Sequence, residues 1–373
     1  MNREVLLLGN PLDHEGGMVE FNKGLIKTLN SIQKNYVLRY ANIGSRMELF
    51  YKPIIKKILY PFIYISDILR ISVTLFNRKV KIVQVNPSLI PIPLLRDSVV
   101  VIIAKVIYRK RIVLVLHGWK ENVFINIERK KLYRRILLNV FRKCDTIYVL
   151  ATDFKEKLVC LGVDSKRIKI TSTFFLEEDI KAIPSNSNVE STIKFIYLGR
   201  ISRLKGIDDL INLLTEYNKF NPNFNCTLIG HSDSTDVISE YKKIVKKNDL
   251  EGKINFVGRI TGEEKFVMLS RADVFLFPSY TEGCPTAVVE ALAVGLYSIT
   301  TDVGALKEMI NVNNGILVKP GDIHGFLDAM KKSTVRLDSI RINRKKISSD
   351  AFKKYEVHSV ANSFIETYSQ LTI

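Results

Sequence analysis

Two cations and two carboxylates have residue types and positions that could bind an anion and hydroxyl groups. Arg200 and Lys205 lie in a loop, Gly199 to Gly206, that follows a predicted buried strand and precedes a predicted helix. Fixed positive charges beside a helix N-terminus, where backbone N–H groups are available, suit a diphosphate. A solvated basic loop would have the same residues, so this loop alone leaves both interpretations open.

The segment 278–295, PSYTEGCPTAVVEALAVG, carries the two carboxylates. Pro285 suits the first turn of a helix, because it lacks the N–H that would be unpaired there. The N–H groups of Gly283, Cys284 and Thr286 would then face an anion. Glu282 would precede the helix and reach sugar hydroxyls, while Glu290 would lie more than a turn inside it and accept from a ribose. The alternative is that Glu282 caps the helix and Glu290 is a surface charge.

The first half of the chain offers fewer candidates. His117-Gly118 follows a predicted central strand, and Gly16-Gly17 precede a predicted helix over 18–29, where a backbone without side chains could approach a ligand closely. A histidine in such a position usually has a structural role, and the glycine pair by itself indicates little.

Alternating strands and helices are expected to position these residues. Apolar runs typical of buried parallel strands occur at 4–8, 36–40, 81–85, 112–116, 146–150, 168–171, 194–198, 226–229, 254–257, 274–277, 297–301 and 316–318. Helical periods fill most gaps, as at 207–220. The pattern predicts an α/β protein with two doubly wound, Rossmann-like domains that face each other across a cleft, with ligands bound beyond the carboxyl ends of the strands.

The polar, turn-rich stretch 184–190 predicts the domain boundary. We expect an amino-terminal domain over 1–184, a carboxyl-terminal domain over 185–350 and a final helix over 351–373.

The charge of the chain points to an anionic partner. Of its 373 residues, 56 are Lys or Arg and 38 are Asp or Glu, a net charge of +18. Residues 1–190 contribute 32 basic and 17 acidic side chains, so the excess lies in the first half. A basic amphipathic helix is predicted over 128–144, and segment 54–76 is strongly apolar and aromatic. Together they suggest a surface that faces an anionic membrane. A core-packed helix with a solvated basic face is the alternative for 128–144.

Other classes find less support. The longest charge-free stretch, 82–95, has 14 residues and three prolines, so no membrane-spanning helix is predicted. The apolar run at the N-terminus is too short for a signal peptide, which indicates a cytoplasmic protein. Four scattered cysteines are expected to be reduced thiols without metal-ligand spacing. Nucleic acid is not expected as a partner, because no zinc finger, RNP-like or helix-turn-helix motif is present.

As a set, these motifs resemble a known family. The loop with Arg200 and Lys205, the segment from Glu282 to Glu290, and the segments 300–310 (TTDVGALKEMI) and 313–322 (NNGILVKPGD) are similar to retaining nucleotide-sugar glycosyltransferases of the GT-B fold, family 4 type. The resemblance is dense over 195–322 and sparser before. It departs from the family at Ser172 to Leu176, where an Asn-Gly turn is common, and at Val294.

The resemblance implies roles for these residues. Arg200 and Lys205 would bind the donor diphosphate and stabilise the departing nucleotide, and Glu290 would hold the ribose. The segment Gly258-Arg259-Ile260 would lie against the base. The transferred sugar would contact Glu282, His117 and the backbone of the segment Gly283-Cys284-Pro285-Thr286, while Gly16 and Gly17 would approach the substrate. No metal or other cofactor is implied, and the final helix would return to the first domain.

We therefore expect a hexose or N-acetylhexosamine to pass from a UDP- or GDP-sugar to a lipid-linked saccharide, in surface polysaccharide assembly at the cytoplasmic membrane face. Retention by front-face displacement is inherited from the resemblance. Two alternatives stay open: a sugar-nucleotide epimerase, which needs no acceptor, and a catalytically silent donor-binding or membrane scaffold protein.

Overall fold

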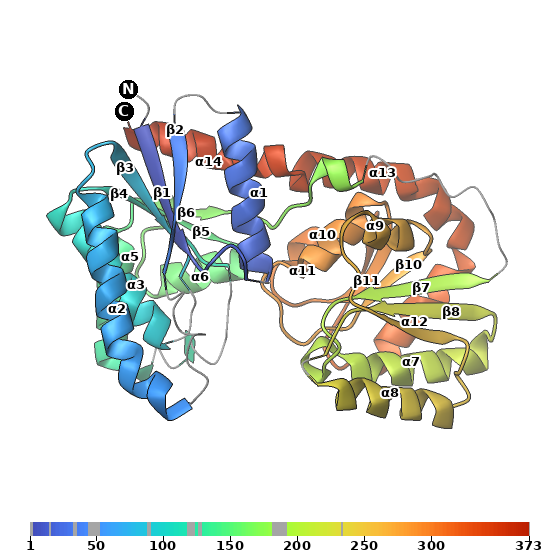
Figure 1. Cartoon of the computed structure of the whole chain (residues 1–373). Helices are drawn as coiled ribbons and strands as arrows, with labels where there is room; N and C mark the ends of the chain where they lie inside the picture. The colour runs from blue at the N-terminus through green and yellow to red at the C-terminus, as the bar shows by residue number, and fades with distance from the viewer. Residues whose placement is uncertain are drawn as a thin grey trace. The chain divides into compact units, whose positions relative to one another are not determined.

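The computed structural model describes residues 3–14, 16–32, 36–43, 53–87, 91–117, 124–125, 129–180, 192–232 and 234–372. The chain divides into two compact units, one formed by residues 1–172 with 357–373 and the other by residues 173–356. Each unit contains a six-stranded parallel sheet, in agreement with the predicted α/β class (Figure 1).

The first unit holds its strands in the order β2-β1-β3-β4-β5-β6. They are β1 (Arg3–Gly9), β2 (Tyr36–Asn42), β3 (Val80–Val85), β4 (Arg111–Val115), β5 (Thr146–Val149) and β6 (Ile168–Ile170). The helices are α1 (Gly17–Ile32), α2 (Pro53–Leu75), α3 (Pro91–Ile102), the π-helical turn η2 (Ile103–Ile107), α5 (Lys131–Lys143), α6 (Thr152–Cys160) and α14 (Val357–Thr372). A short 3₁₀ turn lies at Ser165–Arg167. Two more 3₁₀ turns, Glu177–Asp179 and Arg203–Lys205, belong to the second unit.

Helices cover both faces of this sheet. Helices α1 and α14 contact each other on one face, while α2, α3 and α5 form a layer on the other (Figure 1). Strand order explains the division, because right-handed crossovers that run in opposite directions along a sheet leave their helices on opposite faces. Strands β1, β3, β4 and β5 are consequently almost entirely buried.

The second unit holds its strands in the order β12-β11-β10-β7-β8-β9. They are β7 (Ile193–Leu198), β8 (Phe224–Ile229), β9 (Ile254–Gly258), β10 (Val274–Phe277), β11 (Tyr297–Thr301) and β12 (Gly315–Val318). The helices are α7 (Ile207–Phe220), α8 (Thr235–Lys247), α9 (Gly262–Ser270), α10 (Thr286–Ala293), α11 (Leu306–Met309), α12 (Ile323–Val335) and α13 (Leu337–Tyr355). The strand order reverses between β7 and β10, and a ligand crevice is expected at such a point.

The units divide at other residues than the sequence indicated. The expected boundary stretch, 184–190, lies outside the described residues, and the first unit ends at Ser172 rather than 184. Thr173 already belongs to the second unit, because its hydroxyl donates to the carbonyl of Cys284 at 3.3 Å.

The final helix is also shorter than expected. Residues 351–355 complete α13, and Glu356 is extended, with a ψ of 144° and a bridge to Phe175. Helix α14 therefore starts at Val357 and packs in the first unit, where the Phe364 ring stacks on Tyr148 at 4.4 Å. Among the residues that the structure describes, no helix is long and apolar enough to cross a membrane. All four cysteines are free thiols.

Candidate functional site

The loops after β7 and β10 meet at the switch point of the second sheet. Gly206 has a φ of +73°, and a Cβ there would lie 2.0 Å from the carbonyl oxygen of Pro278. The N–H of Tyr280 donates to the carbonyl of Leu204 at 3.0 Å. A glycine is therefore required at 206, both for the left-handed backbone and for the approach of the two loops.

Lys205 and Glu282 join these loops. Their Nζ and Oε1 atoms are 2.5 Å apart, and the Glu282 side chain is only 8% exposed. Lys205 also donates to the carbonyl of Thr281. Glu282 therefore does not cap the following helix. Its negative charge is balanced by Lys205, the lysine that was expected from the sequence to bind an anion.

The segment from Gly283 to Thr286 is held by the loop after β11. Gly304, at a φ of +53°, leaves no room for a Cβ beside the carbonyls of Glu282 and Gly283, and the N–H of Ala305 donates to the carbonyl of Gly283 at 2.8 Å. Pro285 was expected in the first turn of the helix, and this detail is wrong. Its ψ of 118° is extended, so it is the N-cap, and α10 begins at Thr286. The first N–H groups of a helix have no partner within the helix.

Glu290 lies in the second turn of α10 and is not a surface charge. Its Oε1 is 2.7 Å from Nζ of Lys265 on α9, and both side chains are less than a fifth exposed. Burial raises the pKa of the Glu290 carboxyl, and the Lys265 charge opposes that rise. The pair holds a carboxylate in a dry position, from which it can accept hydrogen bonds from hydroxyls.

Lys265 is a partner in this group that the sequence interpretation missed. It lies 25 positions before Glu290 on another helix, and no spacing rule connects two residues that far apart. Only the packing of α9 beside α10 brings them together.

The remaining residues of the second unit lie at the same edge of the sheet. Arg200 is exposed, and its carbonyl accepts from the Tyr197 hydroxyl at 2.8 Å. Gly258 ends β9 with a φ of +79°, and its carbonyl accepts from the N–H of Gly230 at 2.8 Å. Arg259 and Ile260 follow it. The structure therefore brings Arg200, Lys205, Glu282 and Glu290 to the carboxyl edge of one sheet, as expected.

The Cys284 side chain points into the core. The Thr173 N–H lies 3.5 Å from its Sγ, and burial raises the pKa of this thiol. The Cys284 side chain is therefore not exposed at this edge of the sheet.

The three candidates of the first unit lie around the start of α1. Gly17 is the first residue of α1, and, chain neighbours aside, no atom of the described residues lies within 4 Å of where a Cβ on Gly16 or Gly17 would be. His117 follows β4, its ring 4.4 Å from that of Phe21 on α1. Its Nε2 is buried without a hydrogen-bond partner in the described part of the chain, and burial lowers its pKa to about 4. The ring is therefore neutral at pH 7. Gly118 lies outside the described residues.

No group of three or more His, Cys, Asp or Glu side chains within the described ranges is arranged as metal ligands would be.

The part of the chain that forms this edge resembles known proteins. Residues 179–336 match the model described as glycosyl transferases group 1. Over 202 residues the chain is 27% identical to the amylovoran biosynthesis glycosyltransferase AmsK of Erwinia amylovora, covering 52% of this chain and 48% of that protein. Over 231 residues it is 25% identical to the putative teichuronic acid biosynthesis glycosyltransferase TuaC of Bacillus subtilis, covering 59% and 54%. The chain thus spans about half the length of the curated relatives it matches.

The whole chain also resembles solved structures. The Anabaena protein HepE, crystallised with UDP, superposes with a TM-score of 0.73 at 15% identity, covering 98% of this chain and 100% of that one. This confirms the expected fold, GT-B with two Rossmann-like domains.

Proposed function

We propose, on the premise that residues 179–336 are a glycosyl transferases group 1 domain, that this chain is a glycosyltransferase that moves a hexose or N-acetylhexosamine from a UDP- or GDP-sugar to a saccharide acceptor. The observation that carries the proposal is the Lys205–Glu282 pair, which joins two loops at the strand-order switch point. Two relatives named for the biosynthesis of amylovoran and teichuronic acid support a role in surface polysaccharide assembly.

The donor binds at the carboxyl edge of the second sheet. Arg200 and Lys205 contact the diphosphate and stabilise the charge that grows on it as the sugar leaves. These two cations do the work of a metal, so the proposed reaction uses none. Glu290, held by Lys265, accepts from the ribose hydroxyls, and Gly258, Arg259 and Ile260 line the base.

The transferred sugar contacts Glu282 and the N–H groups that precede α10. His117 would donate or accept a hydrogen bond as a neutral ring, because its folded pKa lies well below 7. We propose that the configuration of the sugar is retained by front-face displacement, in which the leaving phosphate accepts the proton of the acceptor hydroxyl.

The acceptor we propose is a lipid-linked saccharide at the cytoplasmic membrane face, where the protein works as a peripheral enzyme. The excess of 15 positive charges in residues 1–190 supports this, because cations near an anionic leaflet contribute about 1 kcal/mol each.

A transfer assay tests the proposal. Purified protein is incubated with a panel of radiolabelled UDP- and GDP-sugars and a lipid extract of bacterial membranes, and label that moves into the organic phase is counted. We expect one nucleotide sugar to be used, and at least about a hundredfold lower rate in Lys205→Ala. Lys243→Ala, an exposed lysine on α8, is the matched control. NMR of the product then reports the anomeric configuration.

Two outcomes would replace the proposal. Interconversion of one nucleotide sugar into another without any extract would identify an epimerase. Binding of a nucleotide sugar with no turnover under any condition would identify a donor-binding scaffold.

A further inference from the structure

Helix α2 exposes an apolar stripe along its outer side. Its inner side is buried in the first unit through Ile63, Ile71 and Leu75. On the opposite side, at helical spacing, five large apolar side chains are between 56% and 80% exposed: Phe62, Ile65, Leu69, Val73 and, directly after the helix, Phe76. A helix that is apolar all round is normally buried, and monomeric proteins rarely leave such a contiguous patch in water.

The neighbouring elements extend this surface. Helix α3 contacts both α2 and α5, and η2 continues it. The exposed apolar residues of this second row are Leu95, Val99, Val106 and Ile107. The Arg96 guanidinium lies 5.4 Å from the centre of the Tyr64 ring and so holds α3 against α2.

The surroundings of the stripe are strongly cationic. Residues 53–111 contain only two carboxyl groups, Asp67 and Asp97. Both are almost fully buried, each paired with an arginine on its own helix. Arg78, Lys79 and Arg109 are exposed at the ends of the apolar rows. The outer face of α2, α3 and η2 therefore presents apolar and cationic groups without an exposed carboxylate.

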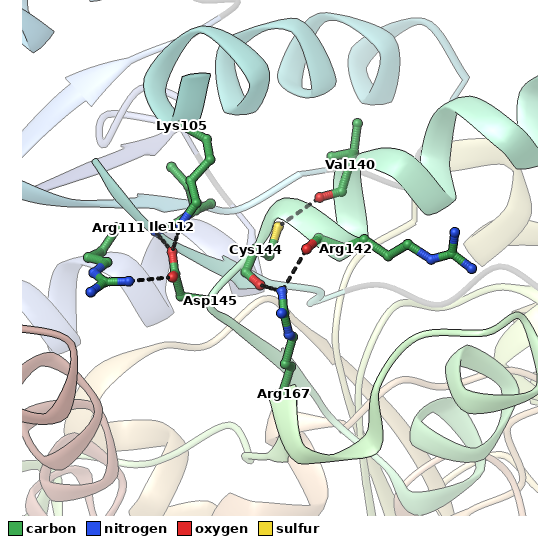
Figure 2. Close-up of polar contacts among 8 residues, drawn as sticks. All are labelled: Lys105, Arg111, Ile112, Val140, Arg142, Cys144, Asp145 and Arg167. Carbon is green, nitrogen blue, oxygen red and sulfur yellow. Dashed lines mark hydrogen bonds and ion pairs between the residues drawn. The ribbon is translucent and has the colours of Figure 1, made fainter. Parts of the chain in front are cut away.

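Helix α5, next to α3, adds a basic row. Lys131, Arg134, Arg135 and Arg142 are exposed on it. The carboxylate that follows α5, Asp145, is directed toward the sheet: it contacts Lys105 at 2.6 Å, Arg111 at 3.1 Å and the N–H of Ile112 at 2.8 Å (Figure 2). Arg167 donates to the carbonyls of Arg142 and Cys144 and fixes the end of the helix (Figure 2). The C-terminal end of α5 is thus fixed by Arg167, and the nearby carboxylate of Asp145 is already paired with Lys105 and Arg111.

We propose that the outer face of α2, α3, η2 and α5 is a docking surface for an anionic lipid bilayer. The α2 stripe enters the boundary between headgroups and acyl chains, and the α5 cations contact headgroup phosphates. The inference deepens the proposed function, because it assigns the peripheral attachment of the enzyme to named residues. The proposed function enters only through the lipid-linked acceptor, which gives the enzyme a reason to be at the membrane.

A second copy of the chain fits this face less well. A symmetric dimer apposes the same patch of both protomers, which would bring cations from both copies into one interface without exposed carboxylates opposite them. An anionic bilayer satisfies both the apolar stripe and the charge.

Vesicle sedimentation of the full chain tests the proposal, since it needs neither donor nor acceptor. The vesicles contain phosphatidylcholine alone or with phosphatidylglycerol. We expect the parent to bind the anionic vesicles and to be released by salt. Replacing Leu69 and Val73 by Ser, or Arg134 and Arg135 by Glu, should each weaken binding at least about tenfold.

Matched controls lie in the second unit. Val335→Ser with Ile342→Ser removes two side chains as exposed as those of α2, and Lys242→Glu with Lys243→Glu reverses two exposed charges on α8. These double variants should bind as the parent does. All changes are at exposed positions, and an unchanged melting temperature verifies folding.

A parent that fails to sediment with either vesicle overturns the proposal, as do equal losses in the controls. Light scattering gives the oligomeric state. If the parent is a dimer and the double variant Leu69→Ser with Val73→Ser is a monomer, the surface serves self-association and the proposal is overturned. Transfer activity is measured separately, so failure of docking and failure of the enzyme assignment are distinguishable.

Discussion

At the scale of single residues, two lysines of the proposed donor site are each paired with a carboxylate. Lys205 pairs with Glu282 and Lys265 with Glu290, and three of these four side chains are less than a fifth exposed. Under the proposed function, a donor diphosphate therefore competes with Glu282 for the ammonium group of Lys205.

Glu282→Gln separates binding of the nucleotide from transfer. Without the carboxylate, Lys205 is fully available, so UDP or GDP should bind roughly three- to tenfold more tightly, which corresponds to about 1 kcal/mol. Transfer should fall by about a hundredfold, because the sugar loses its contact. Calorimetric titration and initial rates measure the two effects. Weaker nucleotide binding in the variant would show that Glu282 does not compete for the lysine.

His117 makes stability depend on pH. Its pKa is about 4 in the folded chain and 6.5 in the unfolded chain, so between these values the unfolded state binds the extra proton. Stability is therefore lost as pH falls through this range, by about 2 kcal/mol between about pH 7 and about pH 5 from this residue alone. His117→Gln should reduce the loss by that amount in urea unfolding at the two pH values. Equal pH dependence of parent and variant would mean that the ring is protonated in the fold.

Residue types singled out the two cations and the two carboxylates of the candidate site, but not their pairing. Arg200, Lys205 and Glu282 stand out because each follows the end of a predicted strand, and Glu290 because it lies in the helix that Glu282 precedes. Lys265 has no such signature. Its part in the site exists only after α9 packs near α10, which is information carried by the whole unit.

At the scale of elements, strands were more predictable than helix ends. All twelve expected strands are present, and most of their ends shift by no more than two residues, because a strand buried on both faces is a continuous apolar run. Helix boundaries depend on backbone angles at single residues, as at Pro285 and Glu356, and no apolar period records them.

Gly206→Ala tests how the loops after β7 and β10 are held together. A Cβ at 206 would be 2.0 Å from the Pro278 carbonyl, whereas at Gly252, with a φ of +80°, it would meet nothing within 4 Å. Both changes strain a left-handed backbone, so Gly252→Ala should cost about 1 kcal/mol. Gly206→Ala should cost about 2 kcal/mol or more and also weaken donor binding, since the loops must move apart. Equal costs in chemical unfolding, with donor binding intact, would contradict this account.

At the scale of the whole molecule, the chain returns at its C-terminus to the unit in which it began. Helix α14 contacts α1 and β3, and the Tyr368 hydroxyl donates to Gln84 in β3 at 2.5 Å. The expectation of a returning helix came from the family resemblance. The amphipathic pattern of α14 does not indicate which of the two sheets the helix covers. Only the structure places α14 in the first unit.

Phe364→Ala tests the dependence of the first unit on α14. The Phe364 ring is fully buried against Tyr148, so the variant should lose about 3–5 kcal/mol. Hydrogen exchange should increase in β1, β3 and β4, and remain unchanged in β7 and β10. Phe326→Ala in α12, also buried, is the matched control and should show the reverse. Faster exchange in both units of either variant would mean that the units unfold together.

The central claim is that the carboxyl edge of the second sheet binds a nucleotide sugar, and thermal shift measures this most directly. A panel of UDP- and GDP-sugars is titrated against the parent, Lys205→Ala, Glu290→Gln and the control Lys243→Ala. The account predicts that the sugars of one nucleotide raise the melting temperature of the parent and the control, and that both site variants lose this rise. Absence of a rise with every nucleotide sugar, or an undiminished rise in Lys205→Ala and Glu290→Gln, would contradict it.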